Sequence, residues 1–226
     1  MKNYLLVSFL LLICLSCSNS GNSKTFITGT TGRYLFNANE VLEVYYKEKI
    51  LLVKWRGREG IKPLQINDSS FYMKELNEKI MFVTTPKMHI ELVEKTEHKG
   101  VKYQFRKMNT GEKTPKEYFN AKDFKNAKIG FLKIQETDSL NPAIKQSVLN
   151  RVGYNYLNNK HLNSAIEILK INTFLYPTSS NTYDSLGDAY LKNKDTTNAI
   201  VNYKKALSIN PENRGSLRTL EMLNKK

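Results

Sequence analysis

Two stretches in the C-terminal half of the chain resemble each other at a spacing of 34 residues. QSVLNRVGYNYLNNKHLNSAIEILKINTFLYP (146–177) aligns with SNTYDSLGDAYLKNKDTTNAIVNYKKALSINP (180–211). The identities include Gly153 with Gly187, Tyr156 with Tyr190, Leu157 with Leu191, Ala165 with Ala199, Ile166 with Ile200 and Pro177 with Pro211. An internal period of this size predicts stacked helical hairpins, because each hairpin buries its apolar face only against its neighbours.

Each 34-residue stretch is predicted to form two helices. Leu149, Val152 and Tyr156 are three and four residues apart, which gives the first helix one apolar stripe. Gly153 is small where the two helices of a hairpin approach closely, and Pro177 follows a helical run that it would end. This pattern resembles the tetratricopeptide repeat, a helical hairpin of about 34 residues. The resemblance implies that the first helices line a concave groove that binds a peptide of a protein partner.

Five first-helix residues are assigned to this groove by the resemblance: Asn150, Tyr154, Asp184, Asp188 and Arg218. Asp184 and Asp188 are four residues apart, so their carboxylates share one helix face, which would prefer a basic or amide-rich segment. We expect Asp184 to help Asn181 cap its helix, whereas Asp188 has no evident packing or capping role. Asn150 and Tyr154 occupy the positions where some family members have a lysine and an asparagine that clamp a C-terminal carboxylate.

The helical region extends beyond the two clear repeats. Residues 121–136 are predicted to form the second helix of a degenerate repeat, and residues 216–224 a terminal helix with a polar outer face. We therefore assign residues 116–226 to a tetratricopeptide array.

The first 17 residues are predicted to be a signal peptide. The apolar run from Tyr4 to Leu15 would reach about 18 Å as a helix, which is too short for a bilayer core of roughly 30 Å. It ends in Cys14-Leu15-Ser16-Cys17, which resembles the lipobox of bacterial lipoproteins, although Cys14 stands where leucine is usual. The resemblance implies lipidation of Cys17, a flexible tether over residues 18–24, and a protein anchored in the cell envelope that faces the periplasm. An ordinary secretory signal is the alternative, and the choice between inner and outer membrane stays open.

Residues 25–110 are predicted to form an antiparallel β domain. Leu51, Val53 and Trp55 alternate with other residues, as Val101, Tyr103 and Phe105 do, and turn residues separate about eight such runs. The whole chain is thus predicted to be α+β, with a small antiparallel β-barrel or sandwich followed by the helical array.

The β domain carries a second resemblance. Gly32-Arg33-Tyr34, Leu52-Val53-Lys54-Trp55 and Ser70-Phe71-Tyr72 are similar to the accessory domain that follows the catalytic domain of beta-lactamase-related serine hydrolases. Their catalytic Ser-x-x-Lys motif is absent, because no serine in the chain has a lysine three residues later. The resemblance therefore implies the accessory part of such an enzyme without its catalytic domain.

Composition and motifs argue against most other chemistry. Lysine and arginine number 35 against 21 acidic residues, a net charge of +14, but the excess is diffuse and indicates no nucleic-acid groove. Beyond Cys17 there is no thiol, and no cofactor motif is present. His89 and Glu91 are conceivable as a metal pair, yet no third ligand is evident. Trp55 with Arg56 is either an aromatic recognition pair or, more simply, part of the core.

These observations favour a non-enzymatic, membrane-anchored lipoprotein that binds a protein or peptide partner in the envelope through its helical groove. The alternative is an accessory or regulatory module of a beta-lactamase-like serine hydrolase, or a remnant of one, that acts on cell-envelope peptides. The identity of the partner and the oligomeric state stay open.

Overall fold

The structure, a computed structural model, describes residues 22–225, and the chain divides into two compact units that we describe separately. The first unit contains residues up to 32 and residues 43–103, and the second contains residues 33–42 and everything from 104 onward. The lipobox and Cys17 lie outside the described residues. Within the described part, no helix has the length and apolar character needed to cross a bilayer.

Helix α1 (Lys24–Thr30) opens the first unit, and it was not predicted. The Ser23 hydroxyl accepts a hydrogen bond from the backbone N–H of Phe26, which caps the helix. The Phe26 ring then packs against Phe71 and Phe82, with ring centroids 6.1 Å and 5.5 Å apart. The half-buried ring of Phe26 therefore attaches this short helix to the strands, and a seven-residue helix needs such packing because it is marginal alone.

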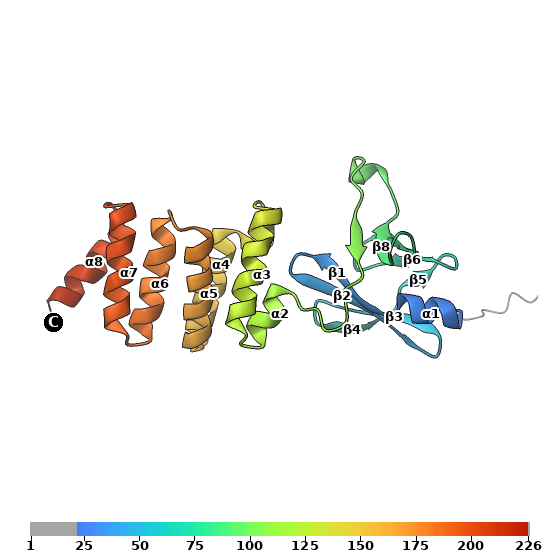
Figure 1. The fold of residues 1–226 in the computed structure, drawn as a ribbon, viewed down its shortest axis with the longest axis horizontal. Helices are drawn as coiled ribbons and strands as arrows, with labels where there is room; N and C mark the ends of the chain where they lie inside the picture. Colours follow the sequence, from blue (N-terminus) through green and yellow to red (C-terminus); the bar gives the residue numbers. More distant parts are fainter. Residues whose placement is uncertain (1–21, 226) are drawn as a thin grey trace, which may run out of the picture. The chain divides into compact units, whose positions relative to one another are not determined.

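The strands form two separate antiparallel sheets in which sequence neighbours are spatial neighbours (Figure 1). The first sheet contains β1 (Gly32–Asn37), β2 (Glu40–Lys47), β3 (Ile50–Trp55) and β4 (Arg58–Ile61). The second contains β5 (Leu64–Gln65), β6 (Ser70–Met73), β7 (Glu78–Val83), β8 (His89–Leu92) and β9 (Gln104–Arg106). The predicted fold class is confirmed, and the strands do not close into a barrel.

Period-two burial confirms most of the predicted strands. In β3, Leu51, Val53 and Trp55 are 2%, 0% and 7% exposed, so Trp55 is a core residue, as its simpler interpretation held. The strand predicted through Val101, Tyr103 and Phe105 is confirmed only at its end: Phe105 is 5% exposed in β9, whereas Val101 and Tyr103 are exposed and precede that strand. The 3₁₀ helix η1 (Thr96–His98) leads into the turn that was predicted at residues 98–100, and residues 101–103 before β9 form no regular strand.

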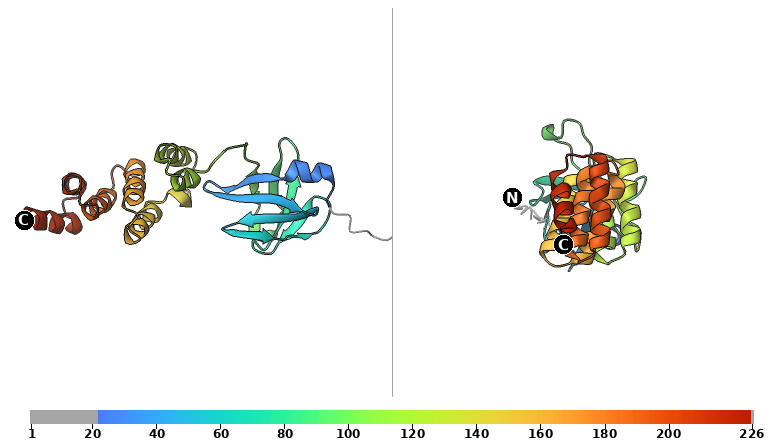
Figure 2. Two further views of the ribbon diagram at one scale, coloured as in Figure 1. Left: turned by 90° about the horizontal axis from the view of Figure 1, so that it is seen from below. Right: turned by 90° about the vertical axis from the view of Figure 1, so that its left-hand side faces the viewer.

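The second unit contains seven α-helices, which stack in successive hairpins (Figure 1, Figure 2). They are α2 (Pro115–Asn120), α3 (Phe124–Thr137), α4 (Gln146–Asn158), α5 (Leu162–Leu175), α6 (Ser180–Lys192), α7 (Thr196–Ile209) and α8 (Arg214–Asn224), with a 3₁₀ helix η2 (Pro142–Ile144) before α4. Helices α5 and α7 end at residues 175 and 209, each two residues before a proline, as predicted.

The turns of three hairpins share one backbone geometry. Lys122, Lys160 and Lys194 each adopt a left-handed conformation, with φ of 64°, 60° and 62°. In each turn the next residue donates its N–H to a tyrosine carbonyl five residues earlier, at 2.9 Å. Helices α2 and α3 are therefore a further copy of the hairpin, which confirms the predicted degenerate repeat; its first helix has 6 residues, where α4 and α6 have 13.

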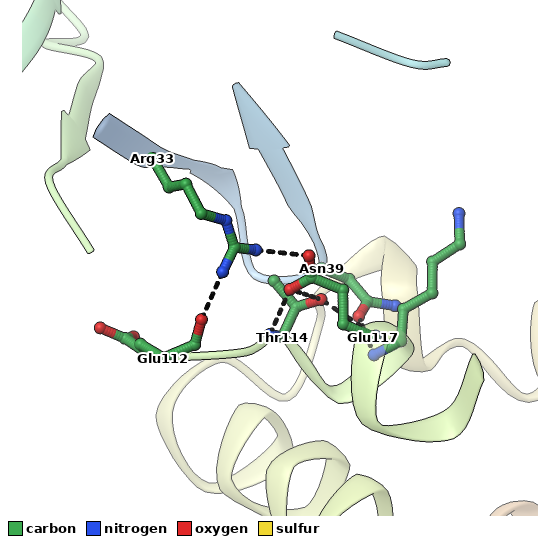
Figure 3. Close-up of polar contacts among 6 residues, drawn as sticks. Arg33, Asn39, Glu112, Thr114 and Glu117 are labelled. Carbon is green, nitrogen blue, oxygen red and sulfur yellow. Dashed lines mark hydrogen bonds and ion pairs between the residues drawn. The ribbon is translucent and has the colours of Figure 1, made fainter. Parts of the chain in front are cut away.

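The short helix α2 is held at its N-terminus by polar contacts (Figure 3). Thr114 and Glu117 form a reciprocal capping box, and Glu117 also pairs with Arg33 of β1. Asn39, in the turn between β1 and β2, accepts the backbone N–H of Lys116 through Oδ1 at 2.7 Å. Asn39 thus adds a further hydrogen bond to the N-terminus of α2, and residues 33–42 group with the helical unit.

Candidate functional site on the first helices

Helices α4, α6 and α8 are the first helices of successive hairpins, and side-chain hydrogen bonds join them. Tyr154 of α4 contacts Asp188 of α6, and Asp184 of α6 contacts Ser216 of α8. The residues predicted to bind a partner project from these helices at equivalent positions, 34 residues apart. We call Asn150, Tyr154, Asp184, Asp188 and Arg218 the first-helix face.

Asp188 receives two tyrosine hydroxyls. Tyr154 donates to Oδ2 at 2.5 Å and Tyr203 of α7 donates to Oδ1 at 2.8 Å. The expectation that Asp188 has no packing role is therefore wrong: it accepts the hydrogen bond of Tyr203, which is 0% exposed. A buried phenol needs such an acceptor, because an unpaired buried hydroxyl costs about 1–3 kcal/mol.

The two phenols stay protonated. Burial, and then the hydrogen bond to Asp188, raise the pKa of Tyr154 and of Tyr203 above the ordinary value of 10. Both hydroxyls therefore remain donors throughout the neutral range. They orient the two carboxylate oxygens of Asp188 from two sides.

Asp184 lies one helical turn before Asp188 and has a different partner. Its Oδ1 accepts the hydroxyl of Ser216 at 2.5 Å. Burial raises the pKa of Asp184, the Ser216 hydrogen bond opposes this shift, and the nearby Asp188 charge adds to it. A Cβ at Gly215 would lie 3.1 Å from the Asp184 carboxylate, so the absence of a side chain there lets α8 approach closely.

The capping role predicted for Asp184 is wrong. Helix α6 begins at Ser180 and its N-cap is Ser179, which places Asn181 and Asp184 inside the helix. Neither can therefore cap its first turn in the predicted way. The carboxylate of Asp184 instead accepts a hydrogen bond from Ser216 of α8.

The other two predicted residues are not joined to this cluster. Asn150 is half-buried on α4, and its Oδ1 is buried without a hydrogen-bond partner among residues 22–225. Arg218 is exposed on α8. In the described chain, no hydrogen bond or ion pair links Asn150 or Arg218 to Tyr154, Asp184 or Asp188. The structure thus brings three of the five residues together.

Tyr203 and Ser216 were missed by the sequence analysis. Tyr203 occupies the position that Leu169 has in the preceding hairpin. A tyrosine at a core position indicates a buried hydroxyl that needs a hydrogen-bond acceptor. That signal was available from the repeat alignment. Ser216 gave none, because serine is an ordinary residue near the start of a terminal helix.

His89 and Glu91, the candidate metal pair in the first unit, contact each other directly. His89 Nε2 lies 2.9 Å from Glu91 Oε1, and the other ring nitrogen bonds the carbonyl of Lys87. The bond to Lys87, with the Glu91 carboxylate, raises the pKa of His89. No group of three or more histidine, cysteine or acidic side chains that could hold a metal ion occurs in residues 22–225.

The repeated hairpins define a class of protein, the helical-repeat arrays. Residues 180–213 match the family model "Tetratricopeptide repeat", so the chain contains such a repeat, and repeats of this type indicate a protein–protein interaction module that is typically non-catalytic. No curated protein sequence matches the chain significantly.

Several solved structures are similar to the helical half. The first tetratricopeptide domain of Spaghetti (RPAP3), bound to an HSP90 peptide, is 17% identical with a TM-score of 0.35, over 49% of this chain and 85% of that one. The MamA protein is 23% identical with a TM-score of 0.34, over 49% of this chain and 58% of its own. The N-terminal domain of stress-induced protein-1 from C. elegans is 17% identical with a TM-score of 0.33, over 49% of this chain and 88% of its own.

Proposed function

We propose that this chain is a non-catalytic, membrane-anchored interaction module whose first-helix face binds a basic segment of a protein partner. The observation that carries the proposal is the pair of carboxylates on α6, Asp184 and Asp188, whose oxygens are oriented by the hydroxyls of Tyr154, Tyr203 and Ser216. Acceptors that are already oriented bind a cationic side chain without a further ordering cost, which favours affinity.

The net charge of +14 disfavours a basic partner at long range, so the proposal depends on short-range contact. At physiological salt, charges further apart than about 8 Å are largely screened. A lysine or arginine placed against Asp184 and Asp188 therefore senses these two carboxylates more strongly than the distant excess of lysines. The first-helix face is therefore expected to distinguish partners by whether a lysine or arginine lies directly against these two carboxylates.

The binding test is capture on an array of 12-residue peptides of graded lysine and arginine content. The wild type should retain the basic peptides, and Asp184→Asn with Asp188→Asn should lose them, because each asparagine keeps an acceptor but removes the charge. The double variant Glu136→Gln with Glu212→Gln is the matched control, since it also removes two charges, from exposed residues of the same helical array. Capture that ignores peptide charge, or equal loss in the control, contradicts the proposal.

The anchor is proposed at Cys17, which lies outside the described residues. The short apolar run and the small Ser16 before Cys17 support it, and helix α1 begins seven residues after that cysteine. Acylation should send the wild type into the membrane and detergent phases, facing the periplasm, whereas Cys17→Ala should accumulate as a precursor or be released. A mass spectrum with an unmodified mature N-terminus would remove the anchor from the proposal.

The alternative function, an accessory module of a beta-lactamase-like hydrolase, stays a prediction from the sequence resemblance. It shares with the first proposal the absence of chemistry in this chain, because the Ser-x-x-Lys motif is missing. Neither a β-lactam nor an ester probe should label the protein covalently. Stoichiometric labelling of a serine would falsify the non-catalytic proposal, and co-purification with a β-lactam-binding enzyme would favour the alternative.

A further inference from the structure

The first unit contains a pocket at the end where the described chain begins. Its volume is about 800 Å³, within the usual range for small-molecule sites. Its walls come from Asn22, from the turn between β2 and β3, and from β5 with the segment before it. Leu51 and Phe71, which are 2% and 1% exposed, give it an apolar floor.

Asn22 forms one wall of this pocket with a fixed side chain. Its Nδ2 donates to the carbonyl of Lys49 at 2.9 Å, which fixes the side chain. Its Oδ1 is buried and has no hydrogen-bond partner among the described residues, and the residue as a whole is 7% exposed. Because that oxygen is closed off from solvent, the polar contacts of a ligand in the pocket would come from the exposed lysines of the rim.

The rim combines exposed apolar side chains with positive charge. Leu64 and Ile50 line the pocket and are 69% and 39% exposed. Lys49 and Lys62 also line it, and both are exposed. One acidic residue, Glu48, belongs to the same rim, so lysine is in excess. Exposed leucine and isoleucine beside lysines is the composition of surfaces that lie in the membrane interface.

We propose that this pocket and its rim dock on an anionic phospholipid surface, with one headgroup in the pocket. The phosphates would pair with Lys49 and Lys62, and Leu64 would contact the acyl boundary. A membrane surface is favoured as the occupant by the position of the proposed anchor: Asn22 follows Cys17 by five residues, a reach of at most about 18 Å. This placement rests on the anchor of the proposed function, whereas the chemistry of the pocket does not.

Sedimentation with phospholipid vesicles tests the surface without the anchor. The chain from Ser18 onward retains every described residue and carries no lipid, so failure of acylation at Cys17 would leave this result unchanged. It should bind vesicles that contain one third phosphatidylglycerol, more weakly in high salt, and should not bind pure phosphatidylcholine. Absence of binding to the anionic vesicles overturns the proposal while leaving the anchor intact.

The variants locate the binding. Lys49→Gln with Lys62→Gln should weaken vesicle binding about thirtyfold, since each lysine near an anionic surface contributes about fivefold. Leu64→Ser, at an exposed position, should weaken binding in both low and high salt. The matched control is Lys74→Gln with Lys87→Gln, two exposed lysines of the same unit outside the pocket. Equal losses in the two double variants would show diffuse charge attraction, and binding of a basic or acidic peptide in place of vesicles would indicate a protein ligand; either result contradicts the proposal.

Discussion

The hairpins α4–α5 and α6–α7 have the same length and the same close approach, but different chemistry at that approach. Both pair a 13-residue helix with a 14-residue helix. A Cβ at Gly153 would lie 2.6 Å from Leu169, and a Cβ at Gly187 would lie 2.6 Å from Tyr203. The geometry is therefore repeated, while the side chain that fills the space changes from leucine to tyrosine.

The departures from the repeat are coupled. Tyr203 replaces Leu169 in register, and Asp188 replaces Tyr154, and the two new residues bind each other at 2.8 Å. Leucine needs no acceptor, whereas a buried tyrosine does, so the aspartate satisfies a need that only the second hairpin has. In this array the repeated positions determine the fold, and the positions that break the period hold the polar cluster.

The largest expected effect comes from filling the close approach. Gly187→Leu should lower the free energy of unfolding by about 3 kcal/mol, because the buried Tyr203 ring is rigid and anchored by Asp188. Gly153→Leu should cost less, because the end of Leu169 is flexible. Urea unfolding of the pair measures the difference. A larger loss in Gly153→Leu would contradict the view that the tyrosine hairpin is the more constrained one.

The next largest effect concerns the acceptor itself. Asp188→Ala should cost about 2 kcal/mol, because it leaves the buried Tyr203 hydroxyl without a partner. In a Tyr203→Phe background the same change should cost clearly less, because the hydroxyl that needs the carboxylate is gone. Thermal or urea unfolding of the four proteins completes the cycle. Additive losses would mean that the two residues are not coupled.

The loop that precedes the shortened hairpin α2–α3 is held by an ion pair, which extends the comparison to charge. Arg106 holds Glu112 through two hydrogen bonds and lowers the pKa of Glu112 to about 2. Since this pKa lies below the ordinary 4.5, the stabilisation is complete above about pH 4.5 and is lost as the pH falls through 2.

Glu112→Gln should therefore lower stability by about 1 kcal/mol at pH 7. Melting curves of the wild type and the variant should converge as the pH is lowered from about 5 toward 2. A difference that is independent of pH would assign the effect to packing instead of charge.

The smallest effect is expected from Asp184→Asn, which installs the residue that the first hairpin has in register. The raised pKa of Asp184 means that the fold disfavours its ionised form, so its contribution is most favourable below pH 3.8 and is lost as the pH rises through the folded value. The variant should be more stable than the wild type by about 0.5 kcal/mol at pH 7. The two should become equal below pH 3.8; a less stable variant at pH 7 would contradict this account of Asp184.

The 34-residue repeat in the sequence predicted the helices and their packing within a hairpin, but few of the side-chain contacts between different helices. The 34-residue spacing predicted α4 to α7 and the close approach at Gly153, because hairpin packing depends on residues of one repeat and its neighbour. The contact of Asp184 with Ser216 joins different helices across 32 residues, and no sequence pattern marks it. The contact of Asp188 with Tyr203 was signalled only by a tyrosine at a position where the preceding repeat has leucine. Helix α1 was missed because it depends on the packing of Phe26 against distant strands.

The most direct test of the central claim is the affinity of the first-helix face for a basic peptide. A lysine-rich peptide that the wild type captures in the peptide test is labelled with a fluorophore. Its anisotropy is measured as the wild type, Asp184→Asn or Glu212→Gln is added, at two salt concentrations. Because Asp184→Asn keeps the acceptor for Ser216, we predict intact folding with affinity at least fivefold weaker, and high salt should reduce that difference. Equal affinity of all three proteins would contradict the claim that these carboxylates recognise the partner.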